Sequence, residues 1–359
     1  MSNSSTNARN ADLSSTKHRF PWKWYLSDLS KTKKNGMNVF SCFSCGGGST
    51  MGYKLAGYNV IGNCEIDPDM MKIYRHNHGP KYSYLMDIRD FVKREDLPSE
   101  LYNLDILDGS PPCSVFSTAG KREDGWNREK VFREGQKKQR LDDLFFWFID
   151  VAKRLQPKVV IAENVKGLII GNAKGYVNEI IKAFDCAGYK VQIFLLNSAK
   201  MGVPQARERV FFVASRKDLN YPKLSLSFHE QPILFGQVRA EKGAYLKDGI
   251  QKEMLKYRKE SDKCLADINL RKRGKACNFN SSIISDKRVA PTLASGGSFF
   301  RMYDGLKLTK TDFVNCQSFP QDYDFLDQPA QYVCGMSVPP VMMANIANEI
   351  ERQWLNESD

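Results

Sequence analysis

Long hydrophobic runs are missing from this sequence of 359 residues. No apolar run reaches the roughly 18 to 20 residues that a helix needs to cross a bilayer. The N-terminus, MSNSSTNARNADLSSTKHRF, also lacks the apolar core of a secretory signal. We therefore expect a cytoplasmic protein without a membrane partner.

Histidine is scarce, and cysteine lacks a regular pattern. The chain has four His and nine Cys, and an odd number with irregular spacing argues against a disulfide framework. Cys42 and Cys45 form one C-x-x-C pair. A zinc site would need further ligands, and ordinary strand residues before a turn explain the pair as well. We predict no metal site.

Acidic residues are outnumbered by basic ones. The chain has 53 Lys and Arg against 41 Asp and Glu, which gives a net charge of +12. A protein with this charge accumulates at polyanions, so nucleic acid is the leading partner. Net charge also serves solubility, and the number by itself is only suggestive.

Apolar periodicity divides the chain into regions. Residues 1–36 are polar, and we expect a flexible tail with one apolar patch, FPWKWYL. In residues 37–216, short apolar strands alternate with amphipathic helical segments such as 141–155 and 176–188. This alternation predicts an α/β domain with a parallel sheet covered by helices on both faces.

Residues 217–359 do not continue this alternation of strands and helices. Residues 217–328 include a basic, weakly periodic stretch, and we expect a smaller second domain, although a solvated insertion would look the same. Residues 329–359 contain PPVMMANIANEIERQWL, which predicts an amphipathic helix that returns to the first domain.

A glycine-rich turn follows the first predicted strand, in FSCGGGSTMGYKLAGY. Glu65 lies about 20 residues further on, at the end of the second strand, as in turns that bind the ribose of a nucleotide. A ribose-bearing ligand is one interpretation. Close packing of a helix on a strand explains the glycines equally well.

Cys113 follows two prolines in GSPPCSVFS, just after the fourth predicted strand. Open α/β sheets bind ligands at this edge, and nearby Lys121 and Arg122 would favour a thiolate, so a nucleophile is preferred to an inert cysteine. Glu163, in VVIAENV, emerges at the same edge. It is either a surface carboxylate or, beside a nucleophile, a group that holds a proton.

Gln205, Arg207 and Arg209 alternate in VPQARERVFF. A period of two puts their side chains on one face of a strand. Three long polar side chains there suit a phosphate or a base edge, or plain solvent cover.

Taken together and in order, these motifs resemble the DNA cytosine-5 methyltransferases. The resemblance runs from about Asn38 to Ile350 and includes GNCEIDP, MDIRD, GSPPCSVFS, AENVKGL, VPQARERVFF, RVAPTLASGG and GMSVPP. It implies a methyltransferase fold that is Rossmann-like, with a mainly parallel seven-stranded sheet and a smaller DNA-recognition domain. It also implies S-adenosylmethionine as cofactor. The positions that match its binding residues are Phe43, Gly47, Glu65, Ile66, Asp87, Pro112, Leu144 and Ser337.

The resemblance also implies the chemistry. Cys113 would add to carbon 6 of a cytosine flipped out of double-stranded DNA, while Glu163 holds a proton at ring N3 and Arg209 binds the carbonyl oxygen. The expected DNA contacts are Ser117, Lys121, Arg122, Gln205 and Arg207. We expect a monomer on DNA, associated with the nucleoid, that protects DNA from a companion restriction endonuclease.

Three positions depart from the family pattern. Cys45 replaces the first glycine of the usual FxGxG, Ser114 replaces a common Gln, and Met336 replaces Asn in GNSVPP. Cys45 and Met336 border the implied cofactor, so we expect these two changes to act on the affinity for S-adenosylmethionine. The alternatives are a tRNA cytosine-5 methyltransferase, a DNA-binding protein without turnover, and a nicotinamide-dependent enzyme, which would leave the Pro-Pro-Cys loop without a role.

Overall fold

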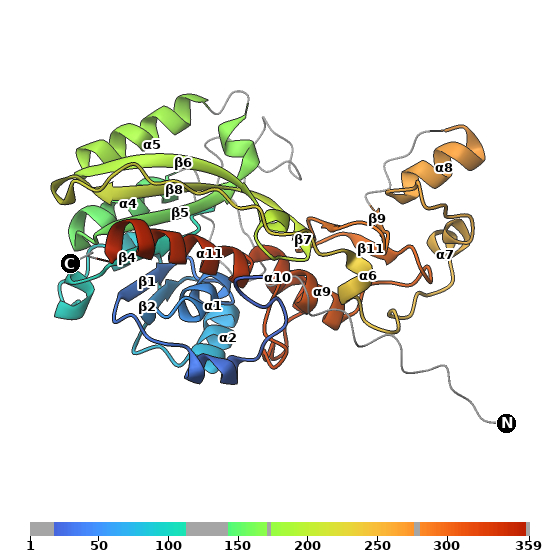
Figure 1. Ribbon diagram of the computed structural model, residues 1–359, viewed down its shortest axis with the longest axis horizontal. Coiled ribbons are helices and arrows are strands. Elements are labelled where there is room, and N and C mark those ends of the chain that lie inside the picture. The colour runs from blue at the N-terminus through green and yellow to red at the C-terminus, as the bar shows by residue number, and fades with distance from the viewer. Residues whose placement is uncertain (1–17, 113–142, 171–173, 276–280, 357–359) are drawn as a thin grey trace.

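The computed structural model describes residues 18–112, 143–170, 174–275 and 281–356 (Figure 1). Seven strands form its central sheet: β1 (Asn38–Cys42), β2 (Asn59–Glu65), β3 (Tyr82–Leu85), β4 (Ile106–Gly109), β5 (Val159–Val165), β6 (Tyr189–Asn197) and β8 (Glu208–Arg216). Their order is β3-β2-β1-β4-β5-β8-β6. Strand β8 runs antiparallel to β5 and β6, and the other neighbours are parallel. The predicted α/β fold with a mainly parallel sheet is confirmed.

Helices cover both faces of this sheet. One face packs against α3 (Ile88–Phe91), α4 (Leu144–Leu155) and α5 (Lys174–Cys186), and the other packs against α1 (Gly48–Leu55) and α11 (Pro340–Ile350). An apolar cluster lies between the sheet and the helices on each face. Neighbouring residues of β1 such as Val39 and Phe40 belong to different clusters, because successive side chains of a strand point to opposite faces. Both faces are therefore apolar, which explains the near-continuous apolar runs in the sequence.

A third apolar cluster extends this core. It joins α2 (Pro68–His78), α6 (Phe235–Val238), α9 (Lys310–Cys316) and α10 (Ala330–Met336). Strand β10 (Ala290–Pro291) pairs with β7 (Gln205–Ala206), which ties the later part of the chain to the segment before β8.

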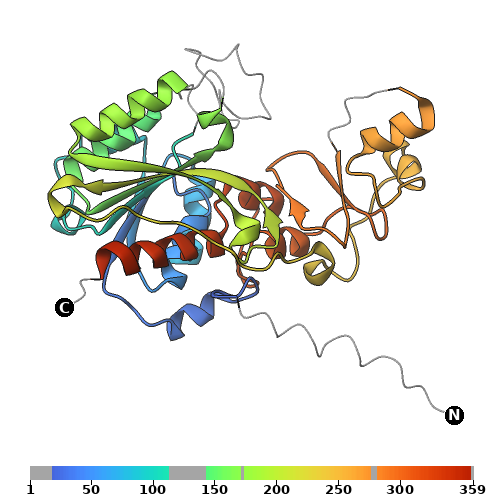
Figure 2. The same ribbon diagram turned by 45° about the horizontal axis from the view of Figure 1, so that its top comes forward.

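A small separate cluster contains α7 (Ile250–Leu255), α8 (Leu265–Arg273) and the parallel strands β9 (Ser281–Ile284) and β11 (Ser298–Arg301). Figures 1 and 2 both show α7 and α8 at the end of the molecule away from the seven-stranded sheet.

The described part of the N-terminal region, residues 18–36, contacts the rest of the protein. Trp24 is 2% exposed and its Nε1 donates to the Ser318 carbonyl at 2.9 Å. Arg19 pairs with Glu349 of α11 at 2.7 Å. These contacts hold the N-terminal segment, including Trp24 of the apolar patch FPWKWYL, against the C-terminal part of the chain.

Within the described ranges, no helix has the length and apolar character that a membrane crossing requires.

Candidate active site

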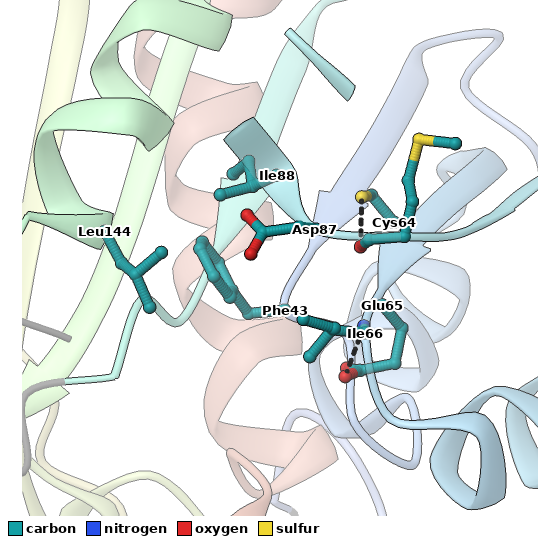
Figure 3. Close-up of a pocket in the computed structure, with 8 residues that line it drawn as sticks. Phe43, Cys64, Glu65, Ile66, Asp87, Ile88 and Leu144 are labelled. Atoms are coloured by element: carbon teal, nitrogen blue, oxygen red, sulfur yellow. Dashed lines mark hydrogen bonds between the residues drawn. The ribbon is translucent and has the colours of Figure 1, made fainter. Parts of the chain in front are cut away.

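A pocket opens beside the carboxyl ends of β1, β2 and β3. Figure 3 shows the Asp87 carboxylate between Ile88 and the Phe43 ring, with Leu144 across from them. Five of the eight residues expected at the cofactor line this pocket, together with three neighbours; the lining is Phe43, Cys64, Glu65, Ile66, Met86, Asp87, Ile88 and Leu144.

The glycine-rich turn after β1 forms one wall. Phe43, Cys45 and Gly47 all have positive φ, of 52°, 47° and 83°, so the backbone reverses sharply before α1. Only Gly adopts this conformation freely. A Cβ on Gly47 would also lie 2.1 Å from Nε2 of His78, so the positive φ and the packing of His78 both favour glycine at this position.

Glu65 ends β2 with its carboxylate held by the backbone. Its Oε1 accepts from the N–H groups of Ile66 and Asp67, both at 2.9 Å, and its Oε2 accepts from Cys45 N–H at 2.8 Å. Burial raises the pKa of Glu65, and these N–H donors oppose that shift. A carboxylate has about four acceptor sites, so one remains on Oε2 for a ligand hydroxyl.

His78 and Tyr323 support the turn from behind. Nε2 of His78 lies 3.2 Å from the Gly46 carbonyl, and the Tyr323 hydroxyl donates to the same oxygen. Burial lowers the pKa of His78 to about 3, so the ring stays neutral and adds no charge beside the pocket.

Two other expected cofactor residues lie outside the pocket lining. Ser337 is buried, and its hydroxyl donates to the Val333 carbonyl at 2.8 Å. Pro112 is half-buried at the end of the described loop.

The second part of the site lies at the same sheet edge. Because β8 is antiparallel to β5, Arg209 at the start of β8 is paired in register with Val165 at the end of β5. Arg209 Nε therefore lies 2.9 Å from Glu163 Oε1, and their side chains are 14% and 12% exposed. Glu163 and Arg209, which the resemblance assigns to one substrate ring, thus form an ion pair; the predicted proximity of Glu163 to Cys113 involves a residue outside the described ranges.

Asn164 was missed by sequence reasoning. Its Nδ2 donates to the Pro111 carbonyl at 3.0 Å, which fixes the loop that leads to Cys113 onto the end of β5. Its position inside the AENV motif was the available signal. Cys113, Ser117, Lys121 and Arg122 lie outside the described residues.

Gln205 and Arg207 are buried. Gln205 is 0% exposed and binds Gln317 and Leu293 through its amide. Arg207 is 2% exposed and donates through Nη2 to the Gly335 carbonyl at 3.0 Å, but its Nε and Nη1 have no hydrogen-bond partner among the described residues. Burial, with the charge of Arg209, lowers the pKa of Arg207 to about 9.

Gln205, Arg207 and Arg209 do not share one continuous strand. Gln205 belongs to β7 and Arg209 to β8, and Arg207 lies between the two strands. Of the three, Arg209 is the one whose side chain reaches Glu163.

The α/β fold, the glycine-rich turn after β1 and the Glu65 carboxylate at the end of β2 are typical of the class of α/β proteins that bind nucleotides. The Glu163–Arg209 ion pair lies at the same edge of the sheet. A model of the C-5 cytosine-specific DNA methylase family matches residues 37–352. The chain belongs to this family.

Individual relatives agree with the family model. The chain is 36% identical over 214 residues to the type II methyltransferase M.FnuDI of Fusobacterium nucleatum, which covers 60% of this chain and 55% of that protein. It therefore spans about half the length of that relative. It is 28% identical over 351 residues to M1.HphI of Haemophilus parahaemolyticus, covering 89% and 88% of the two chains.

A solved structure has the same fold. The crystal structure of a DNA modification methyltransferase assigned to an Escherichia coli prophage aligns with a TM-score of 0.62 at 20% identity, covering 90% of this chain and 100% of that one.

The family implies S-adenosylmethionine, and the pocket residues fit it. The free acceptor site on Glu65 suits a ribose hydroxyl, and the Phe43, Ile66 and Leu144 side chains offer apolar surface to a flat base. Asp87 adds an acceptor at the same pocket for an exocyclic amine.

Proposed function

We propose that this protein transfers a methyl group from S-adenosylmethionine to carbon 5 of cytosine in a specific double-stranded DNA sequence. The observation that carries the proposal is the Glu163–Arg209 pair, which lies at the sheet edge where Asn164 anchors the loop leading to Cys113. Family membership supplies the reaction class.

The methyl donor would rest in the pocket at the ends of β1 to β3. Glu65 would hold its ribose, Asp87 its adenine amine, and Phe43 and Leu144 the faces of the ring. S-adenosylmethionine supplies an electrophilic methyl group when it is bound.

The protein groups prepare the cytosine for that transfer. The Cys113 thiolate attacks ring carbon 6, and the displaced ring electrons make carbon 5 nucleophilic. Glu163 places a proton at ring N3 and Arg209 binds the carbonyl oxygen, so the charge that develops on the ring is stabilised. After methyl transfer, water takes the proton from carbon 5, the Cys113 sulfur leaves carbon 6 as the thiolate, and N3 returns its proton to Glu163, which restores the aromatic ring.

The target nucleotide must leave the DNA stack to reach these groups, at a cost of a few kcal/mol. The Arg207 guanidinium is 2% exposed and donates to the Gly335 carbonyl, so in this proposal it supports the site from within and does not contact a phosphate directly. Ser117, Lys121 and Arg122 remain proposed DNA contacts.

The region 217–328 is the proposed target-recognition module. Within it, residues 239–310 contain 17 Lys and Arg against 8 Asp and Glu, a net +9 of the total +12. Three exposed tyrosines in this stretch each pair with a cation: Lys272 with Tyr257 at 3.8 Å, Arg239 with Tyr303 at 4.2 Å, and Lys252 with Tyr245 at 5.8 Å. A basic surface with exposed rings suits a nucleic acid.

The names of the relatives also support a restriction-modification role, in which a companion endonuclease cuts the unmethylated sequence. We propose a monomer that acts on DNA in the bacterial cytoplasm.

The decisive experiment is bisulfite sequencing of a plasmid from a host without cytosine methylation, expressing either the intact protein or Cys113→Ser. Methylcytosine at one short sequence with the intact protein alone supports DNA methylation, the nucleophile and the recognition site together. A covalent complex with DNA that contains 5-fluorocytosine tests the adduct directly, because fluorine blocks the final elimination. Methylation by Cys113→Ser at the wild-type rate would refute the assigned nucleophile.

A further inference from the structure

Arg89 connects two walls of the cofactor pocket. Its Nη1 donates to Asp87 Oδ2 at 3.0 Å, and its Nη2 donates to Asp143 Oδ1 at 2.6 Å. Asp143 is 54 residues away in sequence, so this contact joins separate elements of the fold. The planar guanidinium suits such a bridge, because its N–H donors have a fixed fork geometry.

On one wall, Arg89 fixes the orientation of Asp87. Asp87 precedes α3, and its Oδ1 accepts from the Arg89 backbone N–H at 2.9 Å, while Oδ2 accepts from the Arg89 side chain. Each oxygen then keeps a free acceptor site. The carboxylate that lines the pocket beside Ile88 is thus held in one plane by a single residue.

On the other wall, Arg89 holds the start of α4. Asp143 directly precedes Leu144, whose side chain lines the pocket opposite Asp87. The second oxygen of Asp143 accepts from Trp147 Nε1 at 3.2 Å, one turn into the helix. Asp143 is thus bound both to Arg89 and to Trp147 of α4, so the Arg89–Asp143 bond holds the start of α4, and with it Leu144, in place.

The charges favour this arrangement. Asp87 and Asp143 are two carboxylates on facing walls, and like charges across a pocket repel unless a cation lies between them. The side chains of Arg89, Asp87 and Asp143 are 21%, 22% and 44% exposed, so the Asp87 side of the bridge is the better shielded from solvent. Two charge-assisted bonds from one guanidinium bind more strongly than an exposed single ion pair.

We propose that Arg89 is a positioning residue for the cofactor, which sets the separation of Asp87 and Leu144 across the adenosine moiety. This inference rests on the proposed function, because it assigns the pocket to S-adenosylmethionine. Arg89 itself acts through Asp87 and Asp143.

The experiment measures S-adenosylmethionine binding by titration calorimetry, and methyl transfer at saturating DNA, for the intact protein and for matched variants. Arg89→Ala should weaken cofactor binding by about 3- to 10-fold and raise KM for S-adenosylmethionine equally, with kcat within about twofold. Arg89→Lys should be intermediate, because an ammonium cannot bridge both carboxylates in one plane. Asp143→Asn keeps an acceptor for Trp147 and should weaken binding by about 2- to 5-fold.

Lys81→Ala is the control, since Lys81 pairs with Glu100 at 2.7 Å on an exposed surface that does not line the pocket. It should bind the cofactor as the intact protein does. A double-variant cycle of Arg89→Ala and Asp143→Asn should show a smaller combined effect than the product of the two single effects.

Two results would overturn the inference. One is wild-type cofactor affinity in both Arg89→Ala and Arg89→Lys. The other is a fall in kcat with KM unchanged, which would point to a general loss of active protein. If the intact protein itself binds no S-adenosylmethionine, the proposed function fails together with the role of Arg89. If the intact protein and both Arg89 variants bind it equally well, only the role of Arg89 is refuted.

Discussion

Asp108 offers a direct test of the electrostatics of the buried core of the sheet. This residue of β4 is 2% exposed, and its carboxylate accepts from the Ser41 hydroxyl at 2.8 Å and the Tyr53 hydroxyl at 3.1 Å. Burial, with a smaller contribution from the charge of Glu163, raises the pKa of Asp108 from 3.8 to about 7, although the hydroxyl donors oppose the shift. We consider the change Asp108→Asn.

The expected magnitude follows from linkage. A pKa raised by about three units corresponds to roughly 4 kcal/mol, at about 1.4 kcal/mol for each unit. Between pH 3.8 and about 7 the unfolded chain has lost the Asp108 proton while the folded protein keeps it. Rising pH therefore favours unfolding over this interval, and the contribution of the protonated carboxyl to stability is lost completely above about pH 7.

The assay is urea unfolding of the intact protein and Asp108→Asn at several pH values from about 4.5 to about 8.5. Asparagine does not titrate, so any change of the difference between the two free energies of unfolding with pH reports the ionisation of Asp108. The amide itself adds only an offset that does not depend on pH. The intact protein should lose stability relative to the variant by about 1.4 kcal/mol per pH unit as the pH approaches 7, and by nothing further well above pH 7.

Asp105→Asn provides the control, because Asp105 lies just before β4 and pairs with Lys158 at 2.9 Å. It shows how loss of a nearby carboxylate affects the protein without touching the Ser41 and Tyr53 hydroxyls. A difference between intact protein and Asp108→Asn that stays constant from pH 4.5 to 7 would refute the reasoning, since Asp108 would then be ionised throughout.

Two further predictions concern the N-terminal segment and the glycine-rich turn. Trp24→Ala removes a buried ring and its hydrogen bond to Ser318, so it should lower the free energy of unfolding by about 3 to 5 kcal/mol. The control Tyr25→Ala, at a ring that is 47% exposed, should change this free energy by less than about 0.5 kcal/mol. Equal losses for the two variants in urea unfolding would contradict the packing argument. Cys45→Gly places a glycine at a position with left-handed backbone and keeps the N–H that donates to Glu65. The Kd for S-adenosylmethionine should therefore stay within about threefold of that of the intact protein. A larger change in titration calorimetry would show that the Cys45 side chain itself contributes to binding.

Local patterns predicted a large part of this structure. Apolar periodicity indicated the alternating strands and the helices that became α4, α5 and α11, and strand ends brought Glu65 and Glu163 to one sheet edge. The motif resemblance supplied Phe43, Asp87 and Leu144, which line one pocket.

Contacts between distant parts of the chain were beyond these patterns. The bond from Trp24 to Ser318 spans 294 residues, and no periodicity within either segment indicates it. The same holds for the bond from Arg89 to Asp143, because an isolated charge in sequence looks like solvated surface. Arg207 was expected at a face of a strand, but the break between β7 and β8 places it in a buried position.

The packing of α11 against α1 has a consequence for protein synthesis. Helix α11 supplies much of the apolar cluster that covers one face of the sheet, and it follows α1 by nearly 300 residues. At about 5 to 20 residues per second, a ribosome needs roughly 15 to 60 s to make the nearly 300 residues between α1 and α11. During that interval one face of the growing sheet lacks the part of its cover that α11 supplies. A product truncated before Pro340 would therefore leave the part of that apolar face that α11 covers exposed to solvent.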